Sequence, residues 1–292
     1  MTPLRERMVE DMQVRNLSPN TQRAYIENVA RFARYFSRSP VDLGPDEIRT
    51  YQVYLTRERH LAPSSIEIAV CALRFLYKVT LKQPWSFDDV IPPPKKPQRL
   101  PVVLSPDEVV QFLARVAGLQ HRAILTTCDA AGLRVSEAVH LRPTDIDSRR
   151  MVIRVEQGKG RRDRYVMLSP TLLTLLRDWW HVHRPTAWLF PGERPAHPIT
   201  SHAVREACQQ AHHRSRLAKP VTPHSLRHAF AVHLLEAGTD VRTMQLRFGH
   251  RRLETTARYL RIATTKVCAT ASPLDLLPRP GLPSDPATPP AG

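Results

Sequence analysis

Apolar residues recur at helical spacing along the first part of the chain. In two segments they fall three or four residues apart, so each set occupies one face of a helix. The two sets are Tyr25, Val29, Phe32 and Phe36, and Ile66, Val70, Leu73 and Tyr77. Ser18-Pro19 and Pro63 are typical helix starts, and a shorter helix is expected near 45–59. Residues 1–82 are therefore predicted to form an all-α domain.

Prolines and basic residues interrupt this pattern at 83–101. The segment contains Pro84, Pro92, Pro93, Pro94, Pro97 and Pro101, together with Lys95, Lys96 and Arg99. Because proline-rich chains are extended and semi-rigid, we predict a basic linker between two domains here. The alternative is a plain spacer without a binding role.

Helical and strand patterns alternate in the remainder of the chain. Ser105 and Glu108 can form a capping box at the start of a helix. Strands are expected at 151–155 and 164–168 on either side of a glycine-rich turn at 157–163, and helices at 124–131, 170–181 and 200–217. We therefore predict a mainly α-helical α+β domain over 102–277 with a small antiparallel β-sheet. A disordered proline-rich tail is expected at 278–292.

The net charge changes the functional picture. The 292 residues are 42% hydrophobic and 24% charged, as in ordinary globular proteins, but they carry a net charge of +16 and a pI near 10.4. Such an excess attracts polyanions, so we expect a nucleic acid partner. A membrane surface is the competing partner, but the arginines are scattered through globular sequence instead of gathered on an amphipathic anchor.

Several classes of protein are disfavoured by the absence of their signatures. No apolar run reaches membrane-spanning length and the first residues lack the apolar core of a signal peptide, so we expect a cytoplasmic protein with no membrane partner. The cysteines are far apart and form no Cys-x-x-Cys pair, which argues against a zinc site or a disulfide framework. They are Cys71, Cys128, Cys208 and Cys268. We expect neither a metal nor a cofactor.

The candidate chemistry is concentrated in residues 222–259. A Thr-Pro helix start precedes His224, Arg227 and His228, whose i, i+3 and i+4 spacing places them on one helix face. Gly249 then ends a helix immediately before His250. The alternative to a functional group of cations is a basic, solvated helix with an incidental histidine pair.

Tyr259 follows nine residues after His250 and is flanked by Arg258 and Arg261. A free phenol has a pKa of about 10, so nucleophilic attack by tyrosine requires nearby cations that stabilise the phenolate. Arginines and histidines would provide that environment and would suit a phosphodiester substrate. The alternative is an ordinary core or surface tyrosine.

Two further candidate cations lie earlier in the chain. Arg134 follows Gly132, which ends a helix, so its guanidinium can bind phosphate oxygens bidentately from a fixed corner. A surface ion pair with Glu137 is the alternative. Lys159 stands at a Gly-Lys-Gly hairpin tip, where a mobile cation can donate a proton to a leaving group. The alternative is a solvated lysine.

Together these motifs resemble the tyrosine recombinase (phage integrase) family, including its Xer-like members, over nearly the whole chain. Ala-Gly-Leu-Arg-Val-Ser-Glu at 131–137 is similar to the first arginine box of the family. Gly-Lys-Gly with the following Arg-Tyr-Val-Met-Leu is similar to its β-hairpin lysine segment. His-Ser-Leu-Arg-His at 224–228, Gly-His at 249–250 and Tyr259 are similar to its second box. Residues 1–82 resemble its SAM-like core-binding domain.

The resemblance implies a catalytic domain with the DNA breaking-rejoining enzyme fold and a defined set of catalytic residues. The implied set is Arg134, Lys159, His224, Arg227, His250 and the nucleophile Tyr259. The two arginines would bind the scissile phosphate, and the tyrosine would form a 3′-phosphotyrosyl link. The lysine would protonate the departing 5′-oxygen, while the histidines assist and Glu137 supports the site. Because the link retains the energy of the diester, this chemistry needs neither metal nor ATP.

The implied function is site-specific DNA recombination by an integrase of a mobile element. Its implied partners are double-stranded DNA and three further copies of the chain, which form a homotetramer on two DNA sites. Accessory DNA-bending or directionality proteins belong to the same expectation. A type IB topoisomerase-like relaxation activity is the enzymatic alternative, because it uses the same chemistry on one strand. A catalytically silent DNA-binding regulator is the alternative from another class.

Overall fold

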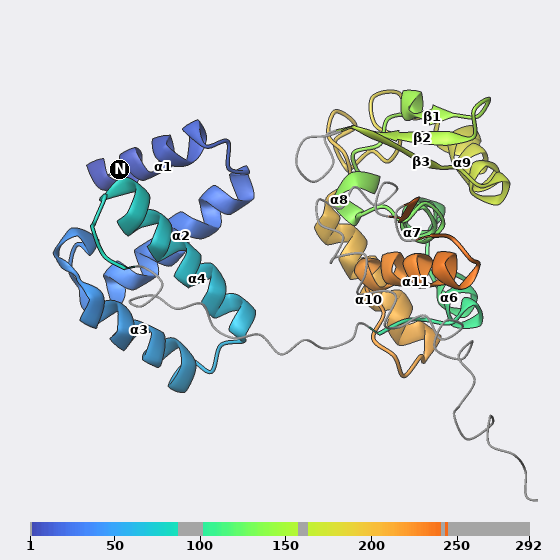
Figure 1. Cartoon of the computed structure of the whole chain (residues 1–292). Helices are drawn as coiled ribbons and strands as arrows, with labels where there is room; N and C mark the ends of the chain where they lie inside the picture. The colour runs from blue at the N-terminus through green and yellow to red at the C-terminus, as the bar shows by residue number, and fades with distance from the viewer. Residues whose placement is uncertain (1, 87–101, 157–162, 241–242, 245–292) are drawn as a thin grey trace, which may run out of the picture. The chain divides into compact units, whose positions relative to one another are not determined.

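The computed structural model describes residues 2–86, 102–156, 163–240 and 243–244. The chain divides into two compact units, Met1–Arg99 and Leu100–Gly292, each with a hydrophobic core of its own (Figure 1). In the described part of the chain, no helix is both long and apolar enough to cross a membrane.

The first unit is helical, as the periodicity predicted. Its helices are α1 (Pro3–Val14), α2 (Pro19–Phe36), α3 (Pro45–Arg57) and α4 (Pro63–Phe75), with a 3₁₀ turn η1 (Pro40–Asp42) and a π-helical turn η2 (Leu76–Thr80) that continues α4. Proline begins each of the four α-helices, where its missing amide hydrogen would have no partner in any case. Ser18 also caps α2 by accepting a hydrogen bond from the Thr21 amide at 3.2 Å.

The predicted apolar faces form the core of this unit. The buried ring of Phe32 packs edge-on against the rings of Tyr51 and Tyr77, at centroid distances of 5.2 and 6.5 Å. Tyr77 donates its hydroxyl to the carbonyl of Pro40 at 2.8 Å. Burial raises the pKa of the Tyr77 hydroxyl, so it remains a neutral donor. This hydrogen bond connects η2, which continues α4, to η1, which follows α2.

The predicted linker at 83–101 begins against this core. The ring of Trp85 packs on that of Tyr77 at 4.9 Å. The remainder of the segment, 87–101, lies outside the described residues, as does the predicted tail at 278–292.

The second unit combines helices with a small antiparallel sheet, as predicted. Its elements are α6 (Pro106–Leu113), α7 (Leu119–Ala130), α8 (Val135–Ala138), η3 (Pro143–Asp145), β1 (Ile146–Asp147), β2 (Val152–Val155), β3 (Arg164–Met167), α9 (Pro170–His183), α10 (Ser201–Ser215) and α11 (Pro223–Glu236). Ser105 and Glu108 form the predicted capping box of α6, with bonds of 3.2 and 2.8 Å.

The sheet has the strand order β1-β2-β3 and lies with α9 to one side of the other helices (Figure 1). β2 and β3 pair from Val152–Met167 to Val155–Arg164. The turn that joins them carries Lys159 and lies outside the described residues. β1 was not predicted, because a strand of two residues is too short for an alternation to be recognised.

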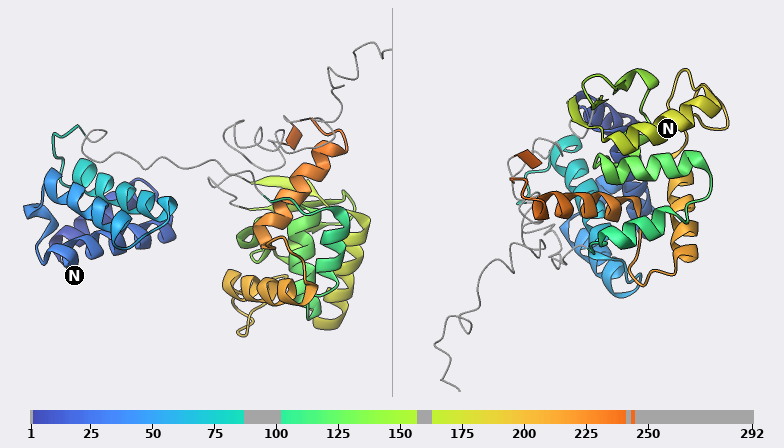
Figure 2. Two further views of the ribbon diagram at one scale, coloured as in Figure 1. Left: turned by 90° about the horizontal axis from the view of Figure 1, so that it is seen from below. Right: turned by 90° about the vertical axis from the view of Figure 1, so that its right-hand side faces the viewer.

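Helix α7 is the central element of the second unit. It packs against α8, α9, α10 and α11, and its residues Ile124, Leu125 and Cys128 are fully buried. Figure 2 shows α11, in orange, lying against the green helices of the same unit. The C-terminal end of α7 thereby lies against the first turns of α11, so the polar side chains at these two places are close together.

Replacing Tyr77 with phenylalanine should destabilise the first unit by about 1–2 kcal/mol, because the buried Pro40 carbonyl loses its hydrogen-bond donor. The free energy of unfolding, measured by urea denaturation of the full chain, checks this expectation. Tyr35→Phe is the matched control, since Tyr35 is 39% exposed and should change stability by less than about 0.5 kcal/mol. Equal stability of the two variants would contradict the assigned role.

Candidate active site

The site is built around the sharp corner between α7 and α8. Gly132 ends α7 with a left-handed backbone, φ +62°, which glycine adopts without strain. A Cβ at this position would lie 2.4 Å from Cδ1 of Phe230 on α11, so the close approach of the two helices also requires glycine. Arg134 follows as the residue that precedes the first turn of α8. The predicted fixed corner is present.

Glu137 is the buried carboxylate at the centre of the site. It accepts hydrogen bonds from the backbone amide of Arg134 at 2.9 Å and from Nη1 of the same residue at 2.8 Å. Arg164 of β3 reaches both carboxylate oxygens, at 3.1 and 2.8 Å. Nη1 of Arg227 lies 3.6 Å from Oε2. The surface ion pair considered for Arg134 and Glu137 is therefore a buried cluster in which three guanidiniums surround one carboxylate.

These contacts determine the charge state of Glu137. Burial alone would raise the pKa of its carboxyl group, since only 7% of the side chain is exposed. The hydrogen bonds and charge of Arg164, followed by those of Arg134, instead hold the pKa down to about 2. Glu137 is therefore ionised at neutral pH, and the cluster retains a net positive charge.

Helix α11 supplies the second guanidinium and a histidine. Thr222 caps the helix by accepting a hydrogen bond from the Ser225 amide at 3.0 Å. Arg227, one turn further, is only 1% exposed and donates to the carbonyl of Gly132. The same glycine thus shapes the corner and anchors the arginine. A buried guanidinium is weakly screened by water, so its interaction with an anion is stronger than at a surface.

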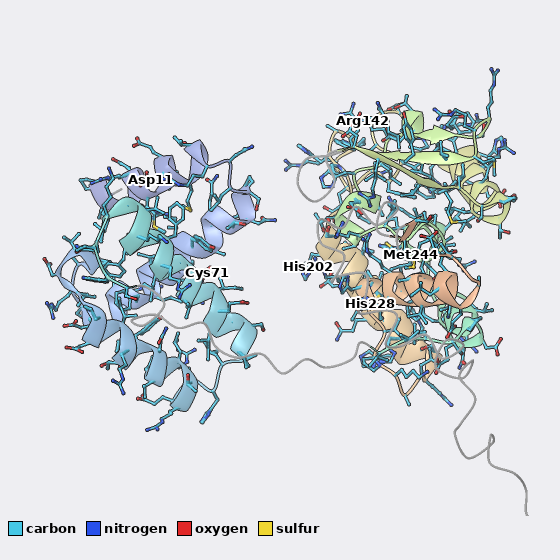
Figure 3. The ribbon with its side chains drawn as sticks, viewed as in Figure 1. Asp11, Cys71, Arg142, His202, His228 and Met244 are labelled. Carbon is cyan, nitrogen blue, oxygen red and sulfur yellow. The ribbon has the colours of Figure 1, made fainter. Side chains whose placement is uncertain are left out.

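His224 lies on the same face of α11, as the helical spacing predicted. Its ring centroid is 4.3 Å from that of His228, whose place on α11 is marked in Figure 3. His224 is an exposed residue, but partial loss of water around its ring lowers its pKa, and the positive charges of Arg227 and Arg134 lower that pKa further. The ring is therefore neutral at neutral pH and can both donate and accept a hydrogen bond.

A cavity of about 540 Å³ opens beside this cluster. Its described polar lining comes from α8, α10 and the start of α11, and no carboxylate is among these described residues. The polar side chains are Arg134, Ser136, Arg205, Gln209, Thr222 and His224. Cations and neutral donors on a concave surface suit an anion such as a phosphate.

The structure brings together three of the six predicted site residues. Arg134, His224 and Arg227 meet at the ends of α7, α8 and α11, whereas Lys159, His250 and Tyr259 lie outside the described residues. Among the described residues, no three histidine, cysteine or carboxylate side chains are grouped as metal ligands.

The sequence interpretation missed the part played by Arg164, which it treated only as a strand residue. Its side chain is 11% exposed, and Val166, two positions later in β3, is buried. Successive odd or even positions of a strand share one face. The sequence could therefore have shown that Arg164 lies on the buried face of β3, because it is two positions before the apolar Val166.

Comparisons with known proteins agree with the fold and with the motifs. Residues 102–266 match the phage integrase family, and residues 4–87 match the phage integrase N-terminal SAM-like domain. These matches confirm the predicted fold class, a helical SAM-like domain followed by a mainly helical domain with a small antiparallel sheet.

Two curated relatives align with most of the chain. An integrase/recombinase of Sinorhizobium fredii is 66% identical and covers 99% of this chain and 94% of its own length. The tyrosine recombinase XerD of Lacticaseibacillus casei is 30% identical and covers 87% of this chain and 92% of its own length.

Two solved structures share the fold at low sequence identity. One is the XerH recombinase bound to its palindromic difH substrate, with a TM-score of 0.72 at 20% identity, covering 88% of this chain and 80% of that one. The other is a lambda integrase dimer bound to a COC′ core site, with a TM-score of 0.72 at 17% identity, covering 87% of this chain and 93% of that one.

Replacing Gly132 with alanine should cost roughly 1 kcal/mol for the left-handed backbone and about 1–3 kcal/mol more for the contact with Phe230. Gly238→Ala is the matched control, because its φ is +90° but an added Cβ would meet no atom within 4 Å. Urea unfolding of both variants measures the difference. If both lost the same stability, the close approach of α7 and α11 would not be what requires glycine at 132.

The titration of His224 provides a second check. Its midpoint should lie below the ordinary 6.5, and Arg134→Gln should raise it by removing a nearby positive charge. NMR of the imidazole ring across the pH range measures both midpoints, with the His224→Gln spectrum assigning the signal. A midpoint above 6.5, or one that does not respond to Arg134→Gln, would contradict the proximity of the two groups.

Proposed function

The chain belongs to the phage integrase family of tyrosine recombinases, and from this premise we propose that it cuts and rejoins DNA through a 3′-phosphotyrosyl link to Tyr259. The family resemblance of the sequence motifs is thereby confirmed. The protein is a site-specific recombinase, an enzyme that breaks and rejoins DNA strands. Its phosphotyrosyl intermediate and the roles of its individual residues belong to the proposal.

The observation that carries the proposal is the convergence of Arg134 and Arg227 on Glu137, with the neutral ring of His224 beside them. A guanidinium fixed in advance, such as that of Arg134 in the cavity wall, can donate hydrogen bonds to the non-bridging oxygens of a phosphodiester with little reorganisation. Fixed positive charge also stabilises the additional negative charge of a five-coordinate phosphorus.

The proposed reaction exchanges one phosphodiester bond for another. The phenol oxygen of Tyr259 attacks phosphorus, its bond to phosphorus forms, and the bond from phosphorus to the 5′-oxygen breaks. His224 takes part in removing the phenol proton, since its ring is neutral and can accept one. Lys159 protonates the departing 5′-oxygen, and His250 donates a hydrogen bond to the phosphate.

Rejoining is the reverse of cleavage with a different strand. The 5′-hydroxyl of another DNA strand attacks the phosphotyrosyl phosphorus, releases Tyr259 and restores a diester. The number and type of phosphorus bonds are the same before and after each step, so no external energy source is required. We also propose that four copies of the chain act together on two duplexes, because recombination of two duplexes cleaves and rejoins four strands.

The names of the relatives support two further parts of the proposal. Several are called integrases, which supports an origin in a mobile element. The solved neighbours include recombinases bound to DNA, which supports double-stranded DNA as the partner of this chain. The net charge of +16 agrees with that partner. Accessory DNA-bending or directionality proteins remain part of the expectation drawn from the sequence.

A covalent adduct between the chain and DNA tests the proposal directly. The full chain is incubated with sheared total DNA of its source organism, the reaction is stopped with detergent, and protein-bound DNA is sequenced. We expect a defined set of sites, and mass spectrometry should find the nucleotide on the peptide that contains Tyr259.

Two tyrosine variants complete the test. Tyr259→Phe should form no adduct, because the nucleophilic oxygen is missing. Tyr165→Phe should form it normally, because Tyr165 is an exposed residue of the sheet that stacks with Arg150 at 5.1 Å. An adduct that survives Tyr259→Phe, or a wild-type chain without one, would refute the proposed chemistry.

A further inference from the structure

Arg164 is the first residue of β3, five positions after Lys159 in the sequence, and it binds the same carboxylate as Arg134. We propose that Arg164 is a positioning residue for strand cleavage, which through Glu137 fixes the β2–β3 hairpin and leaves Arg134 oriented toward the phosphate. This role rests on the recombinase reaction proposed above.

The geometry of the pair is specific. Arg164 is the first residue of β3 and pairs with Val155, the last residue of β2, so this is the strand pair nearest the segment that joins the two strands. Its two terminal nitrogens bind both oxygens of Glu137, at 3.1 and 2.8 Å. Such parallel bonds between a guanidinium and a carboxylate fix orientation as well as distance, which a lysine cannot do. The position of Glu137 and the start of β3 are therefore coupled through these two bonds.

The same pair limits how Arg134 can bind Glu137. Each carboxylate oxygen offers about two acceptor sites. Oε1 accepts from Nη1 of Arg134 and Nη1 of Arg164, and Oε2 accepts from the Arg134 amide and Nη2 of Arg164. Because Arg164 takes the parallel arrangement, the Arg134 side chain holds Glu137 through a single nitrogen. Arg134 also lines the cavity of about 540 Å³ beside the cluster. Without Arg164, the Arg134 guanidinium would be free to turn and take the parallel arrangement, away from that cavity.

The charge balance points the same way. One carboxylate faces three guanidiniums, with Nη1 of Arg227 at 3.6 Å from Oε2. Arg164 is the strongest contributor to the depressed pKa of Glu137. Its removal should let that pKa rise, so protonation of Glu137 would occur at higher pH. A protonated Glu137 forms weaker hydrogen bonds than a carboxylate, so it would orient Arg134 less firmly.

The Cys128 thiol on α7 adds no charge near Glu137, because burial keeps it protonated by raising its pKa. Asp145 and Glu156 line a hollow together with Glu137, and both are bound by Arg154, at 3.1 and 2.6 Å. In the wild type the acid limit of cleavage is expected to follow His224, because the proposed reaction requires its neutral ring and Glu137 protonates only near pH 2.

The test compares Arg164→Gln and Arg164→Lys with Arg154→Gln in the full chain. Arg154 is a matched control, since it lies on the neighbouring strand, pairs with carboxylates and is 40% exposed. Single-turnover adduct formation is measured from pH 4 to 9 on a duplex carrying a cleavage site recovered by adduct sequencing. Affinity for the same duplex is measured by gel shift, and folding by circular dichroism.

Arg164→Gln should slow cleavage by about 10–100-fold, the usual effect of removing a residue that orients a catalytic group, while DNA affinity stays nearly unchanged. Arg164→Lys keeps the charge but loses the parallel bonds, so it should fold normally and show an intermediate rate. Arg154→Gln should behave as the wild type.

Two results would overturn this role. One is a wild-type cleavage rate in Arg164→Gln. The other is a loss of rate that only parallels a loss of folding or DNA affinity, which would make Arg164 a stabilising residue alone. A wild-type chain that forms no adduct refutes the recombinase chemistry itself, and the role of Arg164 with it, so the two failures are distinguishable.

Discussion

The buried carboxylate of Glu137 is the interaction on which the arrangement of the site depends. Three guanidiniums from a helix start, a strand and a distant helix would repel one another if they were brought together without it. Burying ionised groups is costly unless each is paired and hydrogen-bonded, and the side-chain bonds of Arg134 and Arg164 to Glu137 are both ion pairs and hydrogen bonds. One carboxylate and three guanidiniums leave a net positive charge, which a phosphate anion can offset. The geometry of the site is therefore fixed before the anion binds, while its charge is balanced only by the anion.

Packing of the helices provides the second constraint. Helices α7 and α11 approach so closely at Gly132 that no side chain fits there, and the buried carbonyl of that glycine accepts a hydrogen bond from Arg227. The apolar interior of α7 sets this approach, since Ile124, Leu125 and Cys128 are fully buried. The hydrophobic core therefore decides the positions of the cations, although none of its members has a chemical role. A site organised in this way requires little reorganisation when substrate binds.

Sequence patterns predicted the elements of this site better than its connections. Helical spacing placed His224 and Arg227 on one face, and the glycine before Arg134 predicted the corner. The partnership of Glu137 with Arg164 could not be found in the same way, because these residues are 27 positions apart and meet only through packing of β3 against α8. Local patterns show only that Arg164 shares a strand face with the buried Val166, and they do not identify its partner. Lys159, His250 and Tyr259 lie outside the described residues, so their place in the site stays a prediction.

The central claim is that Glu137 holds Arg134 and Arg227 ready for a phosphate that Tyr259 attacks. A structure of the full chain bound to its DNA site, with vanadate at the cleaved position as a mimic of five-coordinate phosphorus, tests this most directly. The account predicts both guanidiniums within hydrogen-bond distance of the vanadate oxygens, Tyr259 bonded to vanadium, and the bonds between Glu137 and Arg164 intact. A vanadate held by other residues, with Tyr259 or the two arginines far from it, would contradict the account.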